Sequence, residues 1–211
     1  MEQTNNLKVP GIRARFLNKY ESEQEKDVIL MQQVHGSSVV VIDEIIPEVL
    51  KRELPVDGLV TELRGLKLAV KTADCIPLLM VETERNIIAA VHVGWRSALE
   101  GIVENALISM LVLGGRVANI RAALGPSLQK ESFPVSKEMM HLYPRTEYKF
   151  FTTKEEGIFF DAPAYVRYRL ERNNVTNIES IDINTYRDDN YYSYRKNPEE
   201  TKRQYSVIEI L

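Results

Sequence analysis

Seven short runs of β-branched and aliphatic residues recur along the chain, and they restrict its fold more than any other feature of the sequence. Runs of this kind are typical of β-strands. We interpret them as the strands of a mixed sheet, and they cover residues 39–42, 66–71, 76–81, 87–93, 120–124, 178–183 and 206–210.

Between the fourth and fifth runs, the apolar residues have the spacing of a helix. Ser97 and Glu100 fit a capping box, so this helix is expected to begin directly after Arg96, and Gly114-Gly115 is expected to end it. The apolar positions follow the i, i+3, i+4 pattern that places them on one helical face. They are Leu99, Ile102, Val103, Ala106, Leu107, Met110 and Leu111.

Two further helices are predicted over residues 136–143 and 163–172, the second with Asp161 near its start. Strands interspersed with helices indicate an α/β or α+β fold, with mixed β-sheets flanked by helices. No repeat, low-complexity tract or linker divides the 211 residues, and 44% of them are hydrophobic, which is enough for one buried core. We therefore expect residues 1–211 to form a single domain.

The charge balance argues against several classes of partner. The chain has 27 Lys+Arg against 30 Asp+Glu and a formal charge of −3, so no excess positive field attracts nucleic acid. No apolar run approaches the roughly 20 residues of a membrane span, and the N-terminal residues lack a signal-peptide pattern. The single cysteine cannot form an intramolecular disulfide. These features favour a cytoplasmic protein that binds neither nucleic acid nor membrane, and they leave its oligomeric state open.

The residues best suited to metal binding are few and lie at the edges of predicted strands. Three histidines and one cysteine are present, and three of these four are His35 in QVHG, Cys75 in TADCIP and His92 in HVGWR. Their long separations are not a local zinc-finger pattern. Any shared site must therefore be assembled by the fold.

Two imidazoles and one thiolate suit Zn²⁺, and three protein ligands leave a fourth position open, as in catalytic zinc sites. Zinc in such a site lowers the pKa of a bound water to about 7 or polarises a substrate oxygen. Asp74 and Gln33 are candidates to orient the ligands or to contact substrate. The structural alternative is that Cys75 acts as a small hydrophobe and that each histidine only makes hydrogen bonds.

Six segments in a fixed order resemble the YfiH-like family, also called laccase-domain or polyphenol-oxidase-like proteins. They are QVHG, DGLVT, TADCIPLLM, AAVHVGWRS, GPS and SYR, and the similarity runs from about Gln32 to the C-terminus. TADC-x-P followed by VHVGWR is its most specific part. The resemblance implies that His35, Cys75 and His92 bind a catalytic zinc. It also implies a fold similar to the catalytic domains of cytotoxic necrotising factor deamidases.

The same resemblance implies an activity. Members of this family are similar in activity to purine nucleoside phosphorylases, and they also deaminate adenosine. The expected partners are therefore phosphate and the nucleosides adenosine, inosine, guanosine and methylthioadenosine. Either phosphate attacks the ribose C1′, or water attacks the purine C6.

Four alternatives stay open. The first is a metal-free cysteine hydrolase with Cys75 as nucleophile and His92 as its base. Copper-dependent phenol oxidation is the source of the family's older label, but a multicopper oxidase needs many histidine ligands and this chain has three. Peptidoglycan-precursor editing has been connected with some bacterial relatives. A binding module without catalysis would leave the open coordination position unexplained.

Two arginines are candidates for substrate binding. Arg96, at the expected helix start, could bind phosphate together with free amide groups, and Arg195 in SYR could reach a ribose or phosphate. Three other residues are interpreted as structural. Trp95 is assigned to the core, Asp57 to a turn, and His141 to an exposed or structural position.

The chain departs from the family pattern at Ser97, Ser127 and Asn184, where relatives commonly have glycine, cysteine and cysteine, respectively. It also lacks the Ser-Thr-Arg and Gly-Gly elements that many relatives carry before QVHG. None of these differences removes an expected ligand, but they leave the preferred nucleoside open. Ser127 is expected to be neither ligand nor nucleophile, because a hydroxyl is a poor ligand for zinc.

Overall fold

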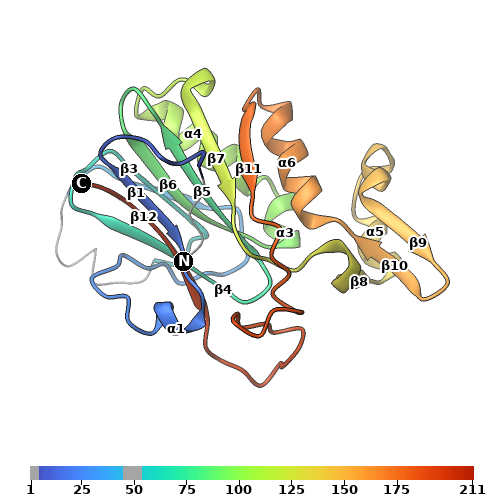
Figure 1. Cartoon of the computed structure of the whole chain (residues 1–211). Coiled ribbons are helices and arrows are strands. Elements are labelled where there is room, and N and C mark those ends of the chain that lie inside the picture. Colours follow the sequence, from blue (N-terminus) through green and yellow to red (C-terminus); the bar gives the residue numbers. More distant parts are fainter. Residues whose placement is uncertain (1–4, 45–53) are drawn as a thin grey trace.

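The computed structural model describes residues 5–44 and 54–211, and within them the strands form three sheets (Figure 1). The central sheet has six strands in the order β11-β7-β5-β6-β3-β2, and β5 is antiparallel to both of its neighbours, β6 and β7. Its members are β2 (Val39–Ile42), β3 (Gly58–Thr61), β5 (Ile76–Glu82), β6 (Ile87–Val93), β7 (Ile120–Leu124) and β11 (Asn177–Ser180).

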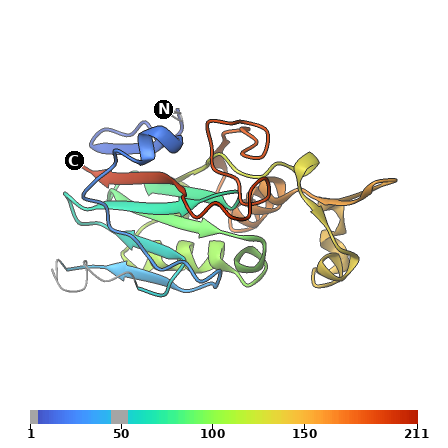
Figure 2. The same cartoon turned by 90° about the horizontal axis from the view of Figure 1, so that it is seen from below.

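The central sheet is covered on both faces. A three-stranded antiparallel sheet of β1 (Ile12–Phe16), β12 (Gln204–Ile210) and β4 (Lys67–Thr72) covers one face. Helices α4 (Ile102–Val112) and α6 (Ala162–Arg172) cover the other, and Figure 2 shows these layers edge-on.

The sequence of β5 explains why it can lie between two layers. Leu79 and Val81 belong to the core that contains β4 and β12 residues, whereas Leu78 and Met80 belong to the core that contains α4 and α6 residues. Side chains of a strand alternate between its two faces, so a strand buried on both faces needs an uninterrupted apolar run. Packing between the two layers holds β5 in place, and with it the position of Cys75, which directly precedes the strand.

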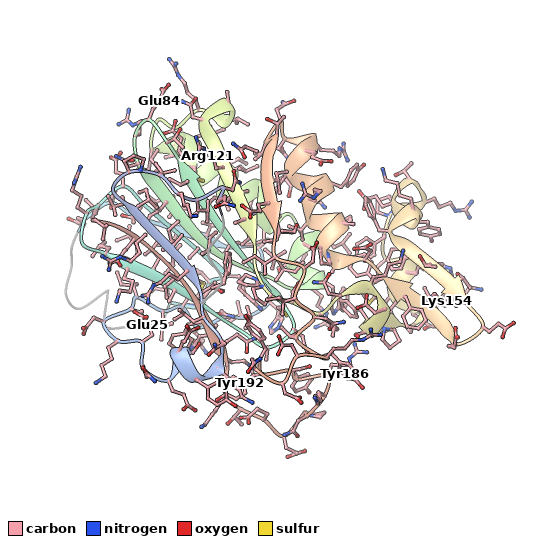
Figure 3. All side chains as sticks on the ribbon, viewed as in Figure 1. Glu25, Glu84, Arg121, Lys154, Tyr186 and Tyr192 are labelled. Carbon is pink, nitrogen blue, oxygen red and sulfur yellow. The ribbon has the colours of Figure 1, made fainter. Side chains whose placement is uncertain are left out.

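A third sheet projects from the layered body (Figures 1 and 2). It contains β8 (Pro134–Val135), β10 (Gly157–Phe160) and β9 (Phe151–Lys154), and Lys154 lies in this projecting part (Figure 3). Helix α1 (Lys19–Ser22), helix α5 (Lys137–His141) and the short 3-10 turns η1 (Val117–Asn119), η2 (Lys130–Ser132) and η3 (Arg145–Phe150) connect the strands. Among the described residues, no helix has the length and apolar character needed to cross a membrane.

The predicted mixed α/β class is confirmed, and so are the seven predicted strands. Three match the predicted ranges, and the others differ only at their ends, where strand 178–183 becomes 177–180. Helices α5 and α6 are also confirmed, with Ser136 and Asp161 as their N-caps. Strands β1, β3, β8, β9 and β10 were not predicted. β1 carries two arginines and β3 begins with glycine, which weakens the apolar pattern of each.

The predicted start of the long helix was wrong. A separate helix, α3 (Trp95–Leu99), begins at Trp95 with Gly94 as its N-cap, and the Ser97 hydroxyl accepts a hydrogen bond from the Gly94 amide. Gly101 has φ +93°, a left-handed conformation that interrupts the helix before α4 begins. The predicted end was correct, because the amides of Gly114 and Gly115 close α4 in a Schellman arrangement.

Candidate metal centre

The structure brings together the three residues expected to bind metal. One potential ligand atom from each of His35, Cys75 and His92 lies within 4.8 Å of the others. His35 comes from the loop before β2, Cys75 directly precedes β5, and His92 lies in β6. Since β5 and β6 are antiparallel neighbours, with Ile76 opposite Val93, the thiol and the His92 imidazole reach the same end of the sheet.

Gly94 leaves room for this cluster because it has no side chain. A Cβ atom on residue 94 would lie 3.2 Å from Cδ2 of His35 and 3.5 Å from Sγ of Cys75. The first distance is shorter than ordinary van der Waals contact, so a side chain here would press on the imidazole of His35. The His35 and His92 rings meet edge to face with 4.8 Å between their centroids.

Asp57 positions both histidines, and sequence reasoning missed it. Its fully buried carboxylate accepts a hydrogen bond from Nδ1 of His92 at 2.7 Å. The same carboxylate accepts hydrogen bonds from the backbone amides of Val34 at 3.2 Å, His35 at 3.0 Å and Gly36 at 2.7 Å. Binding at Nδ1 fixes the ring and leaves Nε2 for a metal.

The expectation that Asp57 only forms a turn was therefore wrong. One signal in the sequence could have indicated its role, because the residue stands directly before the apolar segment GLV. A carboxylate at the edge of a buried strand needs several donors to offset its loss of solvation. The three amides that donate hydrogen bonds to it belong to a loop in which His35 has φ +60°. The carboxylate therefore also stabilises this uncommon backbone conformation.

The charges of the cluster stabilise one another. Burial raises the pKa of the Cys75 thiol, but the adjacent His92 and His35 outweigh that effect and bring its pKa down to about 6. Burial lowers the pKa of His92, whereas the Cys75 thiolate and the Asp57 carboxylate raise it to about 9. In the metal-free cluster these interactions favour a Cys75 thiolate beside a His92 imidazolium. A thiolate is both the metal-binding and the nucleophilic form of cysteine.

The cluster opens into a cavity of about 590 Å³, within the range of about 300–1,000 Å³ that is usual for small-molecule sites. Part of its wall is apolar or aromatic, including Trp95, Phe133 and Tyr194. Another part is basic, formed by Lys71, Arg195 and Arg203. An aromatic wall suits a flat ring, and a basic wall suits an anion.

Gln33 and Asp74, predicted to orient ligands or bind substrate, both line this cavity, and their side chains hold its walls together. The Gln33 amide donates to the Lys71 carbonyl at 2.6 Å and accepts the Lys71 amide at 2.8 Å. Asp74 accepts the Thr185 hydroxyl at 2.8 Å and the Arg195 amide at 2.6 Å. Both side chains therefore fix segments that are distant in the sequence.

The two predicted arginines lie in different surroundings. Arg195 lines the cavity, with its guanidinium 5.4 Å from the centre of the Phe133 ring. Arg96 is exposed, stacks over Trp95 at 4.9 Å and is not among the residues that line the cavity. Trp95 itself is half-buried and contacts both the core and the cavity.

Two other residues lie outside the cluster and the cavity wall. Ser127 is buried and forms a parallel bridge with Asn184. His141 is exposed on α5, where its ring stacks on Tyr148.

Comparisons with known proteins give a consistent picture. The family model described as multi-copper polyphenol oxidoreductase laccase matches residues 3–211. A purine nucleoside phosphorylase of Rickettsia conorii is 32% identical over 166 residues, which is 76% of this chain and 67% of that protein. An adenosine deaminase of an unknown prokaryotic organism is 33% identical over 127 residues, or 58% of this chain and 48% of that protein. The crystal structure of the hypothetical protein YfiH of Bacillus licheniformis superposes with a TM-score of 0.78 at 23% identity, covering 92% of this chain and 79% of that one.

Replacing the Asp57 carboxylate should weaken metal binding. Asp57→Asn keeps the shape of the side chain but removes the charge that orients His92, and such changes typically lower metal affinity by about 10- to 100-fold. Glu82→Gln is the matched control, because Glu82 is also a buried carboxylate that accepts three hydrogen bonds, from Glu84, Arg85 and Asn119. Competition with a chelator measures both affinities. Equal affinity in wild type and Asp57→Asn would contradict the role assigned to this carboxylate.

The metal-free protein should react with iodoacetamide through a thiolate that forms at unusually low pH. Cys75 is the only cysteine of the chain, and its lowered pKa means that the alkylation rate rises as the pH increases through about 6. In His92→Gln the imidazolium is absent, so the midpoint should move towards the ordinary thiol value of about 8.5. A wild-type midpoint near 8.5 would show that the histidines do not stabilise the thiolate.

Proposed function

The chain belongs to the family described as multi-copper polyphenol oxidoreductase laccases, and we propose that it is a zinc-dependent purine nucleoside phosphorylase that also deaminates adenosine. One observation carries the proposal, namely that His35, Cys75 and His92 converge at a cavity with an aromatic and a basic wall. Relatives named purine nucleoside phosphorylase and adenosine deaminase support the choice of reaction.

The donor set favours zinc over copper. Two imidazole nitrogens and one thiolate sulfur are ligands that zinc accepts in three-residue catalytic sites. In the part of the chain that the structure describes, this is the one group of three such side chains placed to share a metal, and the remaining histidine, His141, is exposed on α5. A multicopper centre needs further histidines, which the sequence does not contain.

The cavity walls suit a purine nucleoside and phosphate. Trp95 and Phe133 offer aromatic surface for the base, and the exposed Tyr194 and Arg195 lie at positions from which they can contact the ribose. Adenosine, inosine, guanosine and methylthioadenosine share the purine and the ribose that these walls would contact. The basic residues of the same cavity attract the phosphate anion.

The residues of the chain would act mainly by positioning. In phosphorolysis, a phosphate oxygen forms a bond to the ribose C1′ while the bond from C1′ to the purine nitrogen breaks, and the base leaves with a proton. In deamination, water adds to C6 of adenosine and ammonia leaves. A zinc ion in the site would supply positive charge that polarises an oxygen or acidifies water. Asp57 keeps Nε2 of His92 directed at the site, and the cavity walls hold the base and the anion in place.

A second function is favoured by a specific observation. Asp57, His92 and Cys75 are arranged as an acid, an imidazole and a thiol, with the lowered thiol pKa that a cysteine nucleophile requires. The same residues could therefore form the catalytic centre of a metal-free cysteine hydrolase. His35 distinguishes the two functions experimentally. A zinc site needs it as a ligand, whereas the triad of Asp57, His92 and Cys75 does not need it.

The test is His35→Ala, with His141→Ala as the matched control. If zinc is required, His35→Ala should lower zinc affinity on the order of a hundredfold or more and should lose phosphorolysis and deamination together. His141→Ala should retain both zinc and activity. Metal analysis of protein purified without added metal, followed by adenosine turnover with and without phosphate, measures these outcomes. Full activity in metal-free wild type or in metal-free His35→Ala would instead favour the cysteine hydrolase.

A further inference from the structure

Thr72 is a buried residue of the cavity wall whose hydroxyl has no hydrogen-bond partner. It is the last residue of β4, and its relative exposed surface is 1%. Among the residues that the structure describes, no group donates to its Oγ1 atom or accepts from it. A buried hydroxyl in this state costs free energy, because it gives up hydrogen bonds to water and gains none in return. Buried polar groups of folded proteins are rarely left in this state.

The strand directs this side chain towards the inside of the layered body. Side chains two apart in a strand share a face, so Thr72 lies on the same face of β4 as Leu68 and Val70. Both of these residues belong to the apolar core that β4 and β12 share with β5. Thr72 ends this row, and it lines the same cavity as Cys75 and His92. A polar group therefore stands in an otherwise apolar row at the point where the row meets the candidate metal centre.

The neighbouring polar side chains are already engaged with the protein. Gln204, the partner of Thr72 across the β4–β12 ladder, accepts a hydrogen bond from the Tyr192 amide at 2.8 Å and donates to the Tyr192 carbonyl at 3.2 Å. Gln33 and Asp74, which line the same cavity, also form their hydrogen bonds with protein groups. The Thr72 hydroxyl differs from them because both its donor and its acceptor capacity are unused.

A valine at position 72 would avoid the cost of the unpaired hydroxyl. Valine has nearly the same shape as threonine and is equally suited to a strand, but it has no group that needs a hydrogen bond. The hydroxyl thus adds nothing to the fold that a methyl group would not add, whereas it offers hydrogen bonds to a molecule in the cavity. The oxygen itself is buried, so a ligand reaches it once the side chain turns about χ1, for which strands commonly allow two values.

The ligand group that best matches a threonine hydroxyl is another hydroxyl. Each can donate one hydrogen bond and accept others, so the two can pair in either direction. In the proposed function, the ribose supplies such groups. The cavity wall agrees with this placement, because Trp95 and Phe133 provide aromatic surface for the base, whereas Thr72 belongs with Gln33 and Asp74 to a polar part of the lining.

We propose that Thr72 binds a ribose hydroxyl of the nucleoside. The inference rests on the proposed function, because that function supplies the ribose. The 2′-, 3′- and 5′-hydroxyls share the required chemistry, and nucleoside analogues that lack one of them distinguish the three. The contact would hold the sugar against the polar part of the wall, at the end of β4 that leads to Cys75.

Binding measurements test this contact without depending on turnover. Dissociation constants for adenosine and for its 2′-deoxy, 3′-deoxy and 5′-deoxy analogues are compared in wild type, Thr72→Val and Thr72→Ser. Thr72→Val should weaken adenosine binding by about tenfold, and Thr72→Ser should weaken it less because the hydroxyl is kept. One analogue should bind wild type and Thr72→Val equally, because it lacks the hydroxyl that Thr72 contacts.

Thr61→Val is the matched control. Thr61 is also buried in a strand, but its hydroxyl donates to the Ile42 carbonyl at 2.6 Å and accepts the Leu63 amide at 3.1 Å, and it does not line the cavity. Thr61→Val should therefore lower the Tm by a few degrees and leave adenosine binding unchanged. Thr72→Val should show the opposite pattern, with a Tm that is unchanged or higher and weaker binding.

Three results would overturn the contact. The first is equal adenosine affinity in wild type and Thr72→Val. The second is a Thr72→Val protein that fails to fold or loses as much Tm as Thr61→Val, because the hydroxyl would then have a structural partner. The third is an equal loss of affinity for adenosine and all three analogues in Thr72→Val, because no single ribose hydroxyl would then be involved.

The contact and the proposed function can fail separately. Adenosine binding that depends on the Thr72 hydroxyl, together with no nucleoside turnover, would refute the proposed function and leave the contact standing. Turnover whose KM for adenosine is the same in wild type and Thr72→Val would refute the contact and leave the function standing.

Discussion

The buried carboxylate of Asp57 is the interaction on which the candidate site depends. An ionised group without solvent is costly unless it is fully hydrogen-bonded, and Asp57 meets this condition with His92 and with three successive amides of the 34–36 loop. The two histidines come from segments far apart in the sequence, so this one side chain sets their relative position. Cys75 completes the cluster through the β5–β6 pairing, which is independent of Asp57.

The same carboxylate also contributes to the protonation of the cluster, together with the Cys75 thiolate, which raises the pKa of His92 more strongly. By stabilising positive charge on His92, it helps to keep the metal-free imidazole protonated up to a pKa of about 9, beside a thiol with a pKa of about 6. A metal needs neutral His92 and ionised Cys75, so binding at neutral pH releases the His92 proton. Metal affinity should therefore increase with pH until His92 loses its proton without help from the metal. Once the metal is bound, the carboxylate orients the neutral ring instead.

The parts of the structure that could be predicted from the sequence are those with a strong local pattern. The strands at 76–81 and 87–93 were clear because burial on both faces requires continuous apolar residues. The three candidate metal ligands were identified by their chemistry and by the resemblance of TADC-x-P and VHVGWR to a known family. The break at Gly101 was missed because the apolar spacing continues across it. Asp57 was missed because aspartate before glycine has a common local explanation as a turn, whereas its actual partners are distant in the sequence.

The central claim is that His35, Cys75 and His92 hold one zinc ion that nucleoside turnover requires. Stepwise addition of zinc to the metal-free protein tests it most directly, with adenosine turnover and protection of Cys75 from alkylation followed in the same samples. Both signals should rise together and reach a plateau at about one zinc per chain, because one site binds the metal and carries out the reaction. Turnover that is complete before zinc is added, or that appears while Cys75 remains fully reactive, would contradict the claim.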